Sequence, residues 1–158
     1  MTLSPTVEVD YLSARRLHDN RPWRSATTTA LRNTAVQWAA AFAQPLLPAW
    51  DEEWLAPIRE HWTNCRVRAL EDLSAACLEA GELDLAVEIA DIAAAADPWR
   101  EAPRRLALEA MLRCGEIATA HLRYERFEQL LDDELGIRPS PAMAALLRAR
   151  PAALSTAA

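Results

Sequence analysis

The chain has 158 residues, of which 51% are hydrophobic and 25% are charged, so it is long enough for one domain with a substantial buried core. All seventeen basic residues are arginine, and the formal net charge is −6. Residues 71–158 carry nine arginines against sixteen acidic residues, a balance of −7. Because binding to a nucleic-acid backbone normally needs a basic surface, the composition argues against direct DNA or RNA binding by this chain alone.

The composition also argues against membrane and secreted classes. No run of about 18 apolar residues occurs, and the N-terminus lacks a basic segment followed by an apolar one. Three cysteines, Cys65, Cys77 and Cys114, form an odd set without paired spacing. We therefore expect a cytoplasmic protein with reduced thiols. Alanine is abundant and favours helices throughout.

The first part of the chain predicts a short lead-in and two helices. Residues 1–10 form the extended lead-in, with Asp10 as a possible N-cap of a helix that ends near Leu17. Residues 18–24 are expected to form a loop, and a second helix ends near Phe42. Its N-cap is left open among four hydroxyl residues: Ser25, Thr27, Thr28 and Thr29.

A proline-rich break separates these helices from a long third one. Residues 45–48, Pro-Leu-Leu-Pro, end the preceding helix because proline lacks an amide hydrogen. Asp51 is the expected N-cap of the next helix, with Pro57 in its first turns. This helix is expected to run to about Ala80 and to end at Gly81.

The rest of the chain predicts four helices and a frayed tail. Asp97 is the expected N-cap of the second of them, with Pro98 at its first position. The tail comprises residues 151–158. The four helices cover about residues 83–96, 98–114, 117–135 and 140–148.

A 34-residue period marks the middle of the chain. Gly115 and Ala120 follow Gly81 and Ala86 by 34 positions, which is the period of the tetratricopeptide repeat. A first unit begins at Val67. Such repeats are paired helices that build binding surfaces, so the period favours an interaction module.

The two units differ at one position of close helix crossing. Ala86 and Ala93 are expected where the paired helices approach closely enough that only a small side chain fits. The second unit has Phe127 in place of Ala93, so it is degenerate. The sequence as a whole predicts an all-α, right-handed array of about seven helices with tetratricopeptide-like hairpins.

No group of residues predicts catalysis or cofactor binding. His61 and Cys65 are four apart on a helix, but Cys77 lies about 120° around it, so we predict no metal site. The three glycines occur singly at helix ends and build no phosphate loop. We therefore expect no catalytic, cofactor or metal residues and do not expect an enzyme.

Six tryptophans are candidates for either the core or a recognition surface. Large aromatic side chains usually anchor a core, and this is the expected role for most of them. Trp50 and Trp54 are one helical turn apart, and Trp62 follows on much the same side. Trp99, beside Pro98, is the candidate for an exposed position.

A partner-binding face is predicted where the second unit begins. Arginines near Trp99 are able to bind an acidic partner, or to pair within the chain with Asp97, Glu101 or Glu109. The predicted partner-binding residues are Trp99, Arg100, Arg104, Arg105 and Tyr124.

Four motifs give the chain a family resemblance. Residues 44–54, QPLLPAWDEEW, resemble the "GPLLP…DW" signature of the bacterial transcriptional activator domain, with Gln44 in place of glycine. Residues 97–101, 124–127 and 134–141 resemble further motifs of that family, in its order. The chain from about Val7 to Arg148 is thus similar to the tetratricopeptide-like half of Streptomyces antibiotic regulatory protein (SARP) activators.

The resemblance implies a regulatory role. Family members join this helical domain, here residues 11–150, to an N-terminal winged-helix DNA-binding domain, which is absent from this chain. The lead-in of residues 1–10 resembles the junction after that domain, so the chain is either an excised part or a stand-alone protein. The implied partners are a second copy, the DNA-binding domain, or an RNA polymerase subunit. The alternatives are a general tetratricopeptide-like adaptor or a small-molecule sensor with a pocket among the tryptophan-rich helices.

Overall fold

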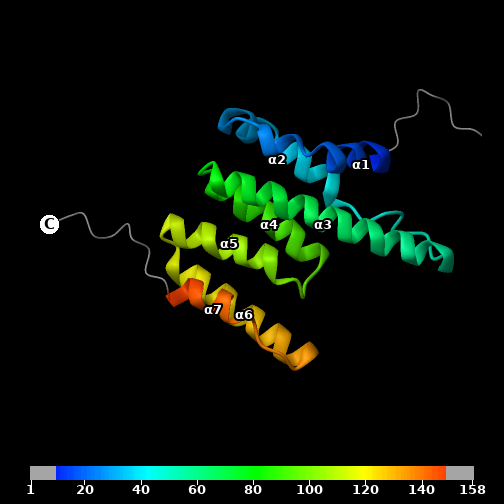
Figure 1. Ribbon diagram of the computed structural model, residues 1–158. Helices are drawn as coiled ribbons and strands as arrows, with labels where there is room; N and C mark the ends of the chain where they lie inside the picture. The colour runs from blue at the N-terminus through cyan, green and yellow to red at the C-terminus, as the bar shows by residue number, and fades with distance from the viewer. Residues whose placement is uncertain (1–9, 149–158) are drawn as a thin grey trace, which may run out of the picture.

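The computed structural model describes residues 10–148 and shows a stack of helices (Figure 1). Within these residues there are seven α-helices, two short 3₁₀ turns and no strand, which confirms the expected all-α class. No helix of this part is long and apolar enough to cross a membrane. The elements are α1 (Asp10–Asn20), η1 (Pro22–Ser25), α2 (Thr28–Ala43), η2 (Glu53–Leu55), α3 (Ala56–Glu79), α4 (Leu83–Ala96), α5 (Glu101–Cys114), α6 (Ile117–Leu135) and α7 (Pro141–Arg148).

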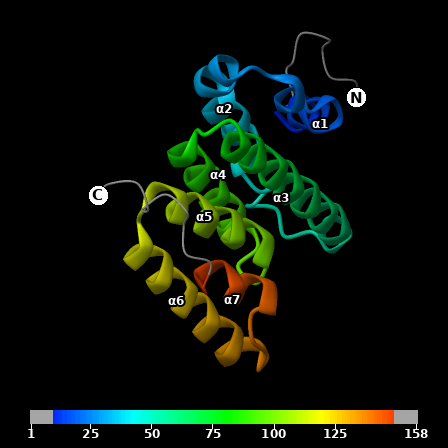
Figure 2. The ribbon, with the colours of Figure 1, turned by 60° about the vertical axis from the view of Figure 1, so that its left-hand side comes forward.

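The helices follow one another across the molecule in chain order. The centre is formed by α3, α4 and α5, which make the most extensive contacts. The pair α1 and α2 covers one side of this centre, and α6 and α7 lie on the other (Figures 1 and 2). The first turns of α3 extend beyond the end of α4, towards the right of Figure 1.

The 34-residue period is visible in the hydrogen bonds of two turns. Gly81 and Gly115 both adopt left-handed backbone, with φ of 81° and 83°, which a side chain would strain. Each ends its helix with the same paired amide–carbonyl bonds of a Schellman motif. The amide after each glycine donates to the carbonyl five residues earlier: Glu82 N to Cys77 O and Glu116 N to Met111 O, both at 2.9 Å.

Small residues set how closely the paired helices approach. Ala86 and Ala93 on α4 are fully buried, and Ser74 Oγ on α3 donates to the Ala86 carbonyl oxygen at 2.8 Å. In the second unit Ala120 is equally buried, but Phe127 brings a buried ring to the position of Ala93. Correspondingly, α5 contacts α6 much less extensively than α3 contacts α4. The second hairpin is therefore more open than the first.

Aromatic rings fill the core of the N-terminal side. Trp23 and Trp62 are buried, as expected for core anchors, and both pack against Phe42 at centroid distances of 6.1 Å. Trp38 lies 6.0 Å from Trp23, and Tyr11 meets Trp62 edge-on at 5.1 Å. These contacts attach α1 and α2 to the first half of α3.

The expected start of the third helix is wrong by four residues, because the N-cap is Leu55 and not Asp51. The α-helix begins at Ala56 rather than after Asp51, and residues 53–55 form a 3₁₀ turn. The reason is Pro57, which occupies the first turn. A helix that began at Asp51 would place this proline in its interior, where its ring clashes with the preceding turn.

The expected start of the fifth helix is also wrong. Asp97 is not its N-cap, because α5 begins at Glu101 and Arg100 occupies the cap position without a side-chain bond. Pro103 lies at the third residue of this helix. A helix from Pro98 would move Pro103 to an interior position, which proline disfavours.

The N-terminal boundaries are partly as expected. The helix α1 begins at Asp10 but continues to Asn20, past the expected end at Leu17. Thr27 is the N-cap of α2, since its Oγ1 accepts a hydrogen bond from the Ala30 amide at 3.3 Å. Residues 1–9 of the expected lead-in and the expected tail at 151–158 lie outside the described residues.

Candidate functional site

Of the five predicted partner-binding residues, two have exposed side chains and three are half-buried. Trp99 is 51% exposed, and Arg105 is also exposed. Arg100, Arg104 and Tyr124 are half-buried, and both of these arginines make contacts within the chain. Trp99 and Arg105 are therefore the members of the set that offer freely exposed side chains.

Arg100 is held by a carboxylate that the sequence did not suggest. Its Nε and Nη2 donate to Oε1 and Oε2 of Glu71 at 2.5 and 3.0 Å, a bidentate pair between the start of α5 and the middle of α3. The pair forms instead of the expected ones with Asp97, Glu101 or Glu109. The hydrogen bond to Glu71 raises the pKa of Arg100, although burial opposes the shift.

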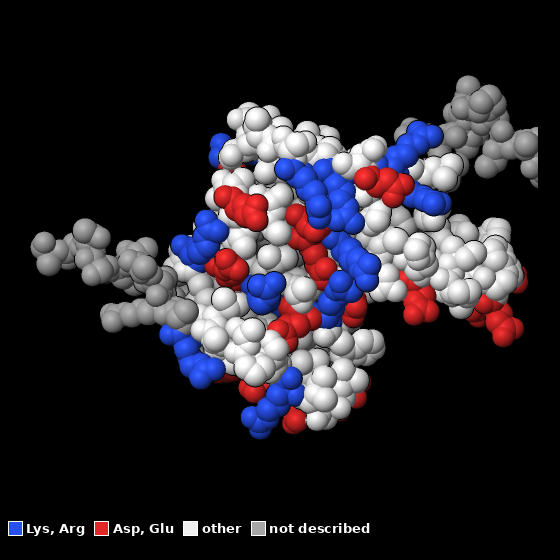
Figure 3. Space-filling model, in the orientation of Figure 1, with Lys and Arg blue, Asp and Glu red and all other residues white. Residues whose placement is uncertain are grey.

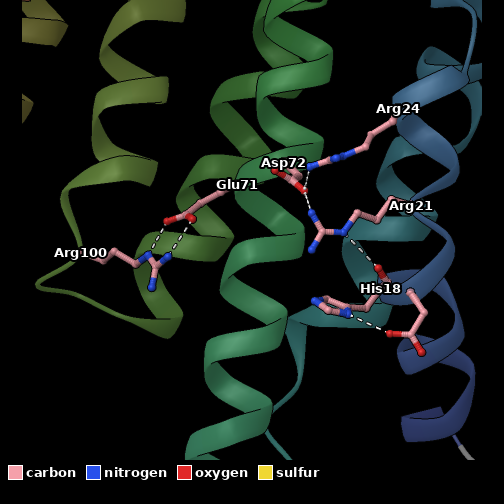
Figure 4. A network of polar contacts seen from close by, with 7 residues as sticks. His18, Arg21, Arg24, Glu71, Asp72 and Arg100 are labelled. Carbon is pink, nitrogen blue, oxygen red and sulfur yellow. Dashed lines mark hydrogen bonds and ion pairs between the residues drawn. The ribbon is translucent and has the colours of Figure 1, made fainter.

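The next carboxylate in the chain, Asp72, points from a different side of α3 than Glu71 does. Asp72 accepts hydrogen bonds from Arg21 and from Arg24 Nη2, the latter at 2.8 Å (Figure 4). Arg21 has left-handed backbone, with φ of 43°, and its Nε donates to the His18 carbonyl oxygen at 3.2 Å. Glu71 and Asp72 thus tie α3 to α5 on one side and to η1 on the other.

The charges of this network are paired with one another, so it stabilises the helix stack and leaves little free charge for a partner. Figure 3 shows blue and red side chains interleaved in a band over the centre of one face of the molecule.

Three arginines surround a pocket in the more open second hairpin. We call it the arginine pocket; it has a volume of about 190 Å³ and lies among α4, α5, α6 and α7. The Arg104 guanidinium carbon lies 4.6 Å from the centre of the Phe127 ring, and its Nε and Nη2 donate to the Pro98 carbonyl oxygen at 3.2 and 3.0 Å. Burial lowers the pKa of Arg104; the charge of Asp91 opposes this shift, and the charge of Arg123 adds to it. The lining residues are Asp91, Arg104, Ala107, Leu108, Arg123, Arg126 and Met143.

The segment before α3 exposes large apolar side chains. Trp50 is 56% exposed and Trp54 is 59% exposed, which contradicts the expectation of a core role for these two tryptophans. Leu47 and Ile58 are exposed nearby in the sequence. We call residues 45–58 the tryptophan loop. Sequence reasoning missed its exposure because it treated Trp50 and Trp54 as residues of one helix.

A single arginine fixes the backbone of the tryptophan loop. Arg59 donates to the carbonyl oxygens of Leu46 at 3.2 Å, Leu47 at 2.5 Å and Trp50. Leu47 has left-handed backbone, with φ of 45°, which costs a leucine roughly 1–2 kcal/mol. The guanidinium of Arg59 therefore faces the loop backbone and holds a strained turn in place.

The surroundings of the loop are acidic. Asp51, Glu52 and Glu53 are all exposed. In Figure 3 the right-hand lobe, formed by the start of α3 and the segment before it, is mostly white with red at its rim. The loop thus combines exposed aromatic rings with free negative charge.

No cluster suited to metal binding is found in the described part of the chain. His61 and Cys65 do approach each other, with 3.5 Å between Nε2 and Sγ. Between residues 10 and 148, however, no group of three or more metal-ligating side chains gathers at one place. Burial and the charge of Glu82 raise the pKa of Cys77 to about 11, so this thiol is a poor nucleophile at neutral pH.

Comparison with known proteins gives one finding that covers nearly the whole fold. The model of the bacterial transcriptional activator domain matches residues 8–149. No curated protein gives a significant match to the chain. The matched range includes all seven helices of the described residues, the tryptophan loop and the arginine pocket. With its paired helices at the tetratricopeptide period, the chain belongs to the bacterial transcriptional activator domain family, a regulatory domain of transcription activators.

Proposed function

We propose that this chain is the protein-interaction and regulatory domain of a bacterial transcription activator, that it acts in the cytoplasm, and that it performs no catalysis. Its partner is a second copy of the domain, the DNA-binding domain, or a subunit of RNA polymerase. The observation that carries this proposal is the tryptophan loop, where Trp50 and Trp54 are each more than half exposed on a backbone held by Arg59.

Exposed tryptophan side chains lower the free energy of unfolding that the chain could reach, so their exposure favours a role in binding. A tryptophan left in water forgoes the free energy of burial, about 25 cal/mol for each Å² of apolar area. Tryptophans are also among the residues that dominate binding energy at protein interfaces. A strained turn at Leu47 adds a further cost, and strain of this kind gathers at functional segments. Together these features support a docking surface.

The face predicted from the sequence remains a second proposed contact. Trp99 and Arg105 are exposed at the start of the second hairpin and are available to a partner. Arg100 and Arg104 support the helix stack through their own contacts. Substitution of these two arginines therefore tests stability and binding together, whereas Trp99→Ala tests binding alone.

The proposal is tested with Trp50→Ser/Trp54→Ser in the intact activator. Transcription of a reporter gene and co-purification with each of the three partners are measured. Since both side chains are exposed, we expect the thermal unfolding midpoint of the purified domain to stay within about 2 °C, while reporter activity and capture of one partner fall at least about tenfold. Trp99→Ser tests the second proposed contact in the same assays. Unchanged activity in both variants, with all partner contacts retained, would refute the proposed role of these surfaces.

A further inference from the structure

We propose that the arginine pocket binds a phosphate group carried by a small molecule. This inference is independent of the tryptophan loop, because no residue of that loop lines the pocket. It rests on three features of the pocket: its origin in the opened second hairpin, its excess of positive charge, and its apolar floor.

The pocket lies beside a position where a large residue replaces a small one. In the first hairpin Ala93 lets the paired helices pack closely, and the residue 34 positions later is Phe127. The ring of Phe127 is fully buried and supports the Arg104 guanidinium at 4.6 Å. Phe127 therefore supports one of the three arginines that line the pocket.

The charge of the pocket is not balanced by the protein. Three arginines line it against one carboxylate, so its formal charge is +2 in a chain whose net charge is −6. Arg123 Nη1 donates to Asp91 Oδ1 at 2.6 Å. Arg104 uses two of its nitrogens on a neutral carbonyl oxygen, and no residue between 10 and 148 accepts a hydrogen bond from Arg126. Several guanidinium N–H groups are thus free to bind an anion.

The charge and size favour a phosphate dianion. Guanidinium groups bind phosphate oxygens through paired N–H donors, and a dianion neutralises a charge of +2. About 190 Å³ corresponds to roughly six water volumes, enough for a phosphate with a few attached atoms. Ala107, Leu108 and Met143 supply apolar contacts for that attached group.

Binding there would connect the two helices of the second hairpin. Arg104 lies on α5 and Arg123 and Arg126 lie on α6, which contacts α5 much less extensively than α4 does. An anion that contacts all three arginines draws α5 and α6 together. The phosphate-bearing ligand is therefore expected to stabilise the C-terminal side of the domain, which provides a readout of binding in addition to the affinity itself.

The test uses inorganic phosphate as the probe. The purified chain is titrated by isothermal calorimetry in chloride buffer of constant ionic strength. We expect saturable binding of one phosphate with a Kd below about 1 mM and, at about ten times that Kd, a rise of roughly 3–5 °C in the unfolding midpoint. Acetate, which has a single charge, is expected to bind at least about tenfold more weakly.

Two arginine variants distinguish the pocket from general charge. Arg126→Gln removes a guanidinium that makes no hydrogen bond or ion pair with residues 10–148, so this variant is expected to fold and to bind phosphate at least about tenfold more weakly. Arg105→Gln removes an equal charge from an exposed position of α5 outside the pocket and is expected to bind normally. Absence of saturable binding below about 10 mM, equal binding of acetate, or equal weakening in both variants would overturn the proposal.

Discussion

Replacing Glu71 by glutamine removes the charge that holds the start of α5 against α3. The pair has two charge-assisted hydrogen bonds to Arg100, and the exposed fractions of the two side chains are 14% for Glu71 and 27% for Arg100. Fully buried bonds to charged groups contribute about 1.5–3 kcal/mol each, and fully exposed pairs less than about 1 kcal/mol. Because this pair is partly screened by water, we expect a coupling free energy of about 1–2 kcal/mol.

The assay is a double-mutant cycle in urea. Unfolding free energies of the parent, Glu71→Gln, Arg100→Gln and the double variant are measured by circular dichroism at 222 nm. The coupling is the part of the double variant's change in unfolding free energy that the two single changes do not sum to. Arg105→Gln, an exposed arginine on the same helix, is the control and is expected to change stability by less than about 0.5 kcal/mol. A coupling below about 0.3 kcal/mol would refute this account of the pair.

The other predictions concern burial and titration. Phe127→Ala removes a fully buried ring and is expected to cost about 3–5 kcal/mol in urea unfolding; a loss under 1 kcal/mol would contradict the packing described. The native fold should keep Cys77 protonated up to about pH 11, whereas a free thiol ionises near 9.0. Because the unfolded state therefore loses this proton first, the free energy of unfolding falls as the pH rises from about 9 to 11. Cys77→Ala should reduce this pH dependence. Exposed Cys114 should react with a disulfide reagent in the native state, whereas Cys77 should react only on unfolding. The hydrogen bond from Arg32 lowers the pKa of Glu82 below 4.5. The contribution of this pair to the free energy of unfolding is therefore complete above pH 4.5 and is lost as the pH falls through the lowered pKa. Glu82→Gln should reduce the pH dependence of acid unfolding, and an unchanged acid profile would count against the pair.

The helices could be predicted from the sequence wherever local signals agreed. The helices at 83–96 and 117–135 have the expected bounds, because glycine marks the preceding turns and the apolar period is regular. The starts of α3 and α5 were predicted too early, since acidic cap candidates at Asp51 and Asp97 outweighed the prolines that follow them. Pro57 and Pro103 decide these boundaries, because proline is tolerated only near a helix start.

The contacts of the candidate site could not be predicted from the sequence, because they join residues that lie far apart in the chain. Arg100 and Glu71 are 29 positions apart, and Arg21 and Asp72 are 51 apart. Charge pairs at such separations depend on the packing of whole helices, which no local pattern specifies. The exposure of Trp50 was missed because the backbone there is not helical and is held by Arg59, nine positions later in the chain.

The unequal lengths of the central helices have a consequence for assembly. With 24 residues, α3 is about 36 Å long, whereas α4, with 14 residues, is about 21 Å long. The extra length of α3 places the start of this helix beyond the stacked hairpins, and the tryptophan loop lies at that projecting end (Figure 1). A macromolecule seated on this projection would not obstruct the second hairpin, so the geometry permits simultaneous occupancy by a bulky partner and a small ligand.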